Sequence, residues 1–129
     1  MVTRAFTFVA FLLLLAPLSA QGDGVVLLSK VDTGADYNDI WGYTAPDGRE
    51  YAIIGTTAGT YFYNATDPTA PYEVAYISGP TSMWRDMKTW SHYAYLVTEG
   101  GGGLQIVDLG DPMNPQLVST HTSFGNAYD

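Results

Sequence analysis

The chain of 129 residues contains no cysteine, only two histidines and only five basic side chains. The absence of cysteine excludes a disulfide framework and any thiolate metal site, so strand pairing and packing must supply the stability. The formal net charge is −8, and a surface of that sign repels phosphate backbones, which excludes nucleic acid as a partner. We expect no cofactor and no metal, because His92 and His121 lie too far apart in sequence to form a recognisable metal site.

Only one stretch of the chain is long and apolar, and it lies near the N-terminus. Arg4 precedes an apolar run from about residue 5 to residue 16, and Leu18-Ser19-Ala20 follows it. This pattern predicts a signal peptide over residues 1–20 and a secreted or cell-surface protein. The run falls short of the roughly 18 residues that a membrane-spanning helix needs, so a membrane anchor is the less favoured alternative and no transmembrane segment is expected.

The rest of the chain contains an internal repeat. The sequence TYFYNATDPTAP at Thr60–Pro71 recurs 44 residues later as LQIVDLGDPMNP at Leu104–Pro115. Upstream, YAIIGTT at Tyr51–Thr57 matches YAYLVTE at Tyr93–Glu99 at an offset of 42. Repetition at this period indicates a fold built from copies of one small unit that cannot bury its apolar face alone.

Each copy reads as four short strands, because the segments are rich in Val, Ile, Tyr, Thr and Trp and show no helical periodicity. Four strands per copy of 40–45 residues is typical of a β-propeller blade. We therefore predict an all-β fragment of a longer β-propeller over residues 21–129, with about two four-stranded antiparallel blades. Its expected parts are a lone outer strand at 25–31, blades at 36–77 and 84–121, and the start of another blade at 127–129. The predicted strands are 25–31, 37–43, 51–56, 59–65, 72–77, 84–90, 93–98, 103–108 and 115–121.

Several strings together resemble the choice-of-anchor B family, which are secreted bacterial proteins built from LVIVD-type repeats. The strings are NDIWGY, GREYAIIG, SMWRDMKTW, HYAYLVTEGGGG and LQIVDLGDPMNP, and the resemblance spans residues 36–129. It implies a β-propeller that is exported and tethered to the cell surface by a C-terminal segment that varies between members. It implies no particular activity. One departure is Asn64, which replaces the aspartate of the repeat.

Three aspartates occupy equivalent positions in the copies. NDIW at Asn38–Trp41 matches RDMK at Arg85–Lys88, so Asp39 and Asp86 correspond, and Asp129 corresponds to both. The first strand of a propeller blade lines the central channel, which makes these carboxylates channel-facing in the predicted fold. They could accept structural hydrogen bonds, or they could gather as a ring that holds a cation or performs acid–base chemistry. Arg85 could pair with such a carboxylate and neutralise its charge. Repetition favours the structural role, because catalytic residues are usually unique, and Asp39, Arg85 and Asp86 remain weak catalytic candidates.

Four polar residues lie where the third strand of each copy ends. Asn64 and Asp108 are the last residues of those strands, and Asp67 and Asp111 each precede a proline in the following turn. Side chains of this type accept hydrogen bonds from backbone groups two residues on. They are predicted to be turn or cap residues, with no ligand required.

The three tryptophans, Trp41, Trp84 and Trp90, have two readings. They could stack on sugars, or they could fill the space between blades, and the second is favoured because alternating aromatic residues on strands usually pack in the core.

Two functions from different classes remain open. The first is a non-enzymatic binding module that presents its loops or channel mouth to an extracellular protein or carbohydrate, in a completed ring expected to be monomeric. The alternative is a channel-centred hydrolase or lyase that uses Asp39, Asp86 and Arg85 together with residues of further blades.

Overall fold

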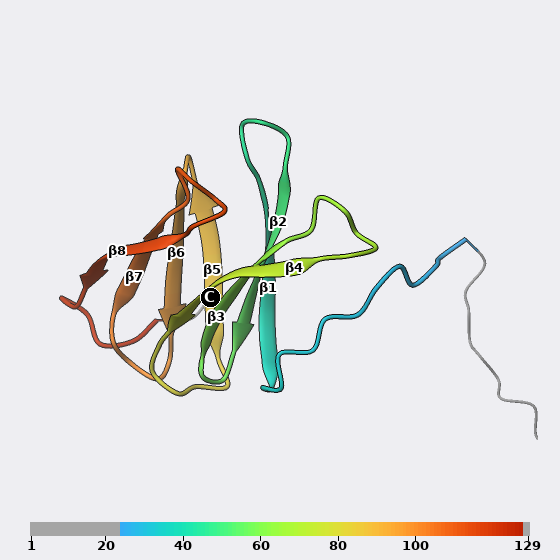
Figure 1. Cartoon of the computed structure of the whole chain (residues 1–129). Helices are drawn as coiled ribbons and strands as arrows, with labels where there is room; N and C mark the ends of the chain where they lie inside the picture. Colours follow the sequence, from blue (N-terminus) through green and yellow to red (C-terminus); the bar gives the residue numbers. More distant parts are fainter. Residues whose placement is uncertain (1–23, 128–129) are drawn as a thin grey trace, which may run out of the picture.

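The computed structural model describes residues 24–127, which form eight β-strands and no helix (Figure 1). The strands make two antiparallel sheets of four strands each. The prediction of an all-β chain with two four-stranded antiparallel blades is thereby confirmed. The predicted signal peptide at 1–20 and Asp129 lie outside the described residues.

Each sheet is a simple meander in which every strand pairs with the next one along the chain. The first sheet contains β1 (Tyr37–Thr44), β2 (Glu50–Thr56), β3 (Gly59–Asn64) and β4 (Tyr72–Ser78). The second sheet contains β5 (Arg85–Trp90), β6 (Tyr93–Thr98), β7 (Leu104–Asp108) and β8 (Gln116–His121). These eight strands lie within one residue of the predicted boundaries at each end.

The repeat is visible in the details of strand pairing as well as in the sequence. The pairing of β3 with β4 shifts between Phe62 and Tyr63, and the pairing of β7 with β8 shifts between Ile106 and Val107. These two irregularities occupy equivalent positions in the repeat, since Ile106 and Val107 lie 44 residues after Phe62 and Tyr63. Because a bulge locally increases strand twist, both outer strands curve at the same place in their sheet.

The predicted outer strand at 25–31 is absent, and this part of the prediction is wrong for the described residues. The segment has no assigned secondary structure, and the apolar residues Val25–Leu28 are exposed. Ser29 Oγ donates to the carbonyl of Pro68, but no strand lies beside the segment to form a ladder. Figure 1 shows it leading away from both sheets. A strand needs a neighbour to satisfy its backbone groups, and the described residues supply none here.

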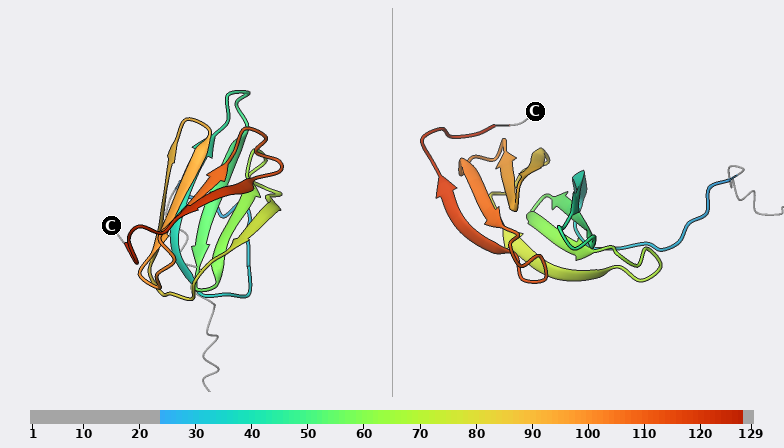
Figure 2. Two further views of the ribbon diagram at one scale, coloured as in Figure 1. Left: turned by 90° about the vertical axis from the view of Figure 1, so that its left-hand side faces the viewer. Right: turned by 90° about the horizontal axis from the view of Figure 1, so that it is seen from above.

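The two sheets lie face to face, as the view from above in Figure 2 shows, and the core lies between them. Strands β1 and β2 of the first sheet contact β5 of the second. The core side chains Ile53, Phe62, Met87, Leu96 and Val107 are at most 1% exposed. Their burial removes apolar surface from water, which is the main favourable contribution to folding.

Candidate functional site

The two described aspartates of the predicted set lie on neighbouring strands, Asp39 in β1 and Asp86 in β5. Asp86 is buried, and its Oδ1 accepts hydrogen bonds from the backbone N–H of Met87 and from Lys88 Nζ, both at 2.8 Å. Both partners belong to its own strand. The carboxylate of Asp86 therefore has a local structural role in β5.

Arg85 lies beside Asp86 in sequence but points into the contact between the two sheets. Its side chain is 1% exposed. Its Nε donates to the carbonyl of Thr56 at 3.1 Å, and its Nη2 donates to the carbonyl of Pro80 at 2.8 Å. In the described part of the chain the ion pairs are Arg49–Asp47 and Lys88–Asp86, so the possible pairing of Arg85 with an aspartate is not observed.

Burial affects the electrostatics of this arginine. Removal from water lowers the pKa of the Arg85 guanidinium from its ordinary value, while the nearby Tyr76 has a smaller opposite effect. Arginine nevertheless keeps its proton in proteins. The carbonyl dipoles that accept its hydrogen bonds stabilise the buried charge. Because these carbonyls belong to Thr56 and Pro80, Arg85 also holds the first sheet to the linker between the sheets.

Asn38 occupies the position in β1 that Arg85 occupies in β5, and the sequence reasoning did not assign it a role. Its Nδ2 donates to the carbonyl of Ser82 at 3.4 Å. Its Oδ1 is buried without a hydrogen-bond partner. The sequence contained one indication of this role: the match of NDIW with RDMK aligns Asn38 with Arg85. Both side chains hold the linker between the sheets.

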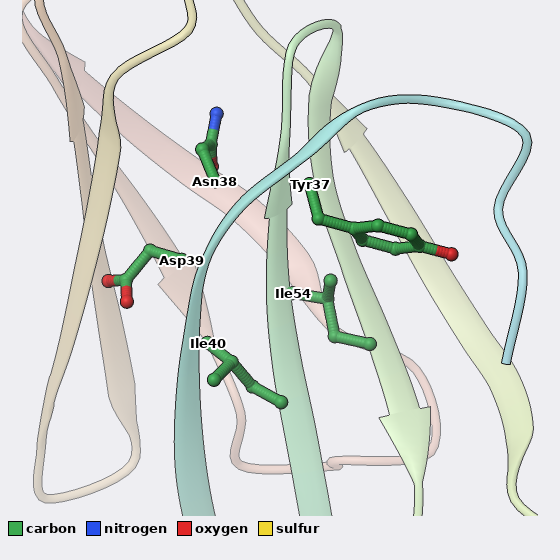
Figure 3. A pocket seen from close by; sticks show the side chains of 5 residues that line it. All are labelled: Tyr37, Asn38, Asp39, Ile40 and Ile54. Carbon is green, nitrogen blue, oxygen red and sulfur yellow. The ribbon is translucent and has the colours of Figure 1, made fainter. Parts of the chain in front are cut away.

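The residues around Asp39 line an open pocket of about 420 Å³. The lining residues are Tyr37, Asn38, Asp39, Ile40 and Ile54. Figure 3 shows Asp39 pointing to one side of β1, whereas Tyr37, Ile40 and Ile54 point to the other. The apolar half of the pocket therefore belongs to the outward face of the first sheet, where it can hold an apolar group.

Among residues 24–127, no three His, Asp or Glu side chains gather closely enough to hold an ion. General acid–base catalysis needs a group within hydrogen-bond reach of the proton that it transfers. Of the members of the predicted set that lie within residues 24–127, Asp39 is the one that borders the pocket.

The four predicted turn residues each accept a hydrogen bond from the backbone N–H two residues further on. The donors are Thr66 to Asn64 at 3.0 Å, Thr69 to Asp67 at 2.9 Å, Gly110 to Asp108 at 2.7 Å and Met113 to Asp111 at 3.2 Å. At Asp67 the hydroxyl of Thr69 adds a second bond, and the two bonds lower the pKa of this carboxyl. These contacts give each residue a local role in its turn.

The tryptophans differ from one another. Trp41 packs against the core, donates from Nε1 to Thr89 Oγ1 at 2.9 Å, and has Lys88 Nζ 4.7 Å from its ring centre. The packing prediction is correct for Trp41. It is wrong for Trp84 and Trp90 in this chain, because both are exposed. Trp90 lies on the outward face of the second sheet, where the described residues place no further sheet against it.

No helix of residues 24–127 has the length and apolar character needed to cross a membrane. Comparison of the chain with protein-family models, with curated proteins and with solved structures found no match.

Proposed function

We propose that the chain contributes consecutive blades to a secreted or surface-tethered β-propeller that acts as a non-enzymatic binding module. The internal repeat, the two equivalent four-stranded sheets and the resemblance to choice-of-anchor B proteins support a propeller. The predicted signal peptide supports export. The partner is an extracellular protein or carbohydrate.

The hydrogen bonds of Arg85 and Asp86 are the main support for a non-enzymatic function. Arg85 donates to two backbone carbonyls, and Asp86 accepts from Met87 and Lys88 of its own strand. A catalytic group must be free to reach a substrate. These bonds favour a structural role for Arg85 in the contact between the sheets and for Asp86 within β5.

The alternative is a channel-centred hydrolase or lyase in which Asp39, Asp86 and Arg85 act with residues of further blades. One observation favours it: Asp39 borders a pocket of about 420 Å³. A single carboxylate of this kind could serve as a general base if another blade supplied the acid.

A panel of extracellular polysaccharides and peptides distinguishes these functions. The secreted protein is incubated with each compound, and retention and product release are measured together. We expect retention of a partner without product, and unchanged retention in Asp39→Asn. Asp36→Asn provides the matched control, since it makes the same acid-to-amide change just before β1. Product release that Asp39→Asn abolishes and Asp36→Asn preserves would establish the enzyme instead.

A further inference from the structure

The two sheets bury opposite faces of the same repeated unit. In β2 the buried side chains Tyr51 and Ile53 alternate with the half-buried Ala52 and Ile54. In β6 the alternation is inverted, because the positions that match Ala52 and Ile54 are buried and those that match Tyr51 and Ile53 are half-buried. Each sheet therefore leaves uncovered the face that the other sheet buries.

The outward face of the second sheet, here called face B, matches the inward face of the first sheet. On the first sheet Tyr43, Tyr51, Ile53 and Phe62 are buried, and on face B their counterparts are exposed or half-buried. Lys88 stands on face B in the place of the half-buried Trp41. Tyr43, at 8% exposed, corresponds to Trp90, at 77%. The other corresponding pairs are Tyr51 with Tyr93, Ile53 with Tyr95, and Phe62 with Ile106.

The outward face of the first sheet, here called face A, matches the inward face of the second. Met87, at 0% exposed, corresponds to Ile40, at 63%. The other corresponding pairs are Ala94 with Ala52, Leu96 with Ile54, and Val107 with Tyr63. On face A, Ala52 and Ile54 are half-buried and Tyr63 is buried at 8%. The apolar half of the pocket, formed by Tyr37, Ile40 and Ile54, lies on face A. A space of this size beside exposed apolar side chains is suited to receive large side chains from a neighbouring sheet.

Faces A and B thus carry the two halves of the interface already present inside the molecule. We propose that the chain self-associates head to tail, with face B of one copy packed on face A of the next. Each new contact repeats the packing of the second sheet on the first, and it places Trp90 of one copy against the side of β1 that carries Ile40. A contact between two different surfaces closes into a ring when the rotation allows and otherwise continues as a filament.

A second copy is the occupant that the structure specifies, because the internal interface shows what each face binds. That interface is apolar and aromatic, with Trp41 and Phe62 on one side and Met87 and Leu96 on the other. Stacking of equivalent units is how repeated folds bury faces that a single unit cannot cover. This inference rests on the proposed propeller, because it assigns the neighbouring blades to further copies of this chain, whereas partner retention tests the binding role separately.

Two charge substitutions test the proposal through the oligomeric state, measured by sedimentation velocity over a range of concentrations. Ile40→Glu blocks face A and Trp90→Glu blocks face B, and both sites are exposed, so both variants are expected to fold. We expect each variant alone to associate at least about tenfold more weakly, because a carboxylate would be buried in an apolar contact. A mixture of the two variants should form a one-to-one dimer, since each supplies the face that the other lacks.

Leu27→Glu is the matched control. Leu27 is also exposed and apolar, at 80%, but it lies outside both faces, so this variant should associate like the unsubstituted chain. Circular dichroism and thermal melting verify that each variant is folded. The proposal is overturned if the unsubstituted chain remains monomeric, if either blocked variant still dimerises alone, or if the mixture fails to pair.

Cysteine cross-linking gives a second measurement that does not depend on the charged variants. The chain has no cysteine, so every cross-link must come from an introduced residue. Chains with Ile40→Cys are mixed with chains with Trp90→Cys and treated with a short thiol cross-linker. We expect mixed dimers in excess over either same-variant dimer. An excess of same-variant dimers would show a symmetric contact and overturn the head-to-tail arrangement.

Discussion

At the scale of single residues, a buried arginine joins the two sheets without an acidic partner. Arg85 is enclosed by the first sheet and the linker and donates to the carbonyls of Thr56 and Pro80. Gly79 allows this close approach, because a Cβ at that position would lie 2.7 Å from Arg85 Nη1. The charge is thus satisfied by backbone dipoles from two segments, which makes its removal costly.

Replacement of this arginine should destabilise the fold. Arg85→Met keeps much of the side-chain volume but removes the donors to the buried carbonyl of Thr56 and the part-buried carbonyl of Pro80. We expect a loss of at least about 2 kcal/mol in the free energy of unfolding. Chemical denaturation measures it. Arg49→Met is the matched control, because Arg49 is exposed and pairs with Asp47 within one turn. An equal loss in the two variants would contradict a joining role for Arg85.

The turn carboxylates permit a test by pH. Two bonds from Thr69 lower the pKa of Asp67 below its ordinary 3.8. Because the folded-state pKa is lowered, these bonds stabilise the turn above the ordinary pKa and are lost as the pH falls through the lowered value. Thr69→Val removes the hydroxyl donor and should raise the pKa of Asp67 towards its ordinary value, as measured by NMR titration. Thr66→Val should leave it unchanged, and a shift there would contradict the assignment.

At the scale of the strand and turn, the glycine run between β6 and β7 has a specific conformational purpose. Gly101, Gly102 and Gly103 all have positive φ, at 91°, 82° and 73°. At Gly103 a Cβ would also overlap the carbonyl oxygen of His121, at the end of β8. The run is therefore required both for its backbone conformation and for the close approach of two strands.

Gly103→Ala should cost about 1–3 kcal/mol, since it combines an unfavourable φ with overlap against the backbone of His121. Gly42→Ala is the control. Gly42 lies in β1 with open space around its Cβ position and no positive φ. Thermal unfolding of the two variants checks the difference. Equal melting temperatures would mean that the turn can adopt another conformation at no cost.

The segment before β1 should contribute little to the stability of the two sheets. It contacts them through the hydrogen bond from Ser29 Oγ to Pro68 O, and through Tyr37 OH, which donates to the carbonyl of Val31. Because both bonds are exposed, deletion of residues 24–31 should change the free energy of unfolding by no more than about 0.5 kcal/mol. Denaturant unfolding measures this change. A larger loss would indicate that the segment pairs with a sheet.

At the scale of the whole molecule, charge opposes the association that the two outward faces favour. Each chain carries a net charge of −8. Raising the ionic strength from about 0.01 M to about 1 M shortens the screening length roughly tenfold, which weakens the repulsion between copies but not the apolar contact. Self-association should therefore strengthen with salt, as measured by sedimentation equilibrium. Dissociation by salt would indicate that charged pairs hold the copies together.

Much of the fold could be predicted because its signals are local. The Asp67 and Asp111 turns, the alternating strand residues and the repeat at an offset of 44 residues placed eight strands to within one residue. The prediction of a strand at 25–31 was wrong because a strand also needs a neighbouring strand, and no local sequence pattern reveals whether one is present.

The candidate site was less predictable. The sequence marked Asp39, Arg85 and Asp86 as equivalent or adjacent, but whether a charged group meets a carboxylate, a carbonyl or solvent depends on segments distant along the chain. Arg85 meets Thr56, which lies 29 residues away. Its partners were therefore visible only in the folded molecule.

The sequence by itself determined the repeated unit, the strand class of each segment and the turns, because these depend on side chains a few residues apart. Only the tertiary structure decided which face each sheet buries. Burial in β2 and β6 has opposite phase although their sequences match, because the two sheets share one interface and contribute opposite faces to it.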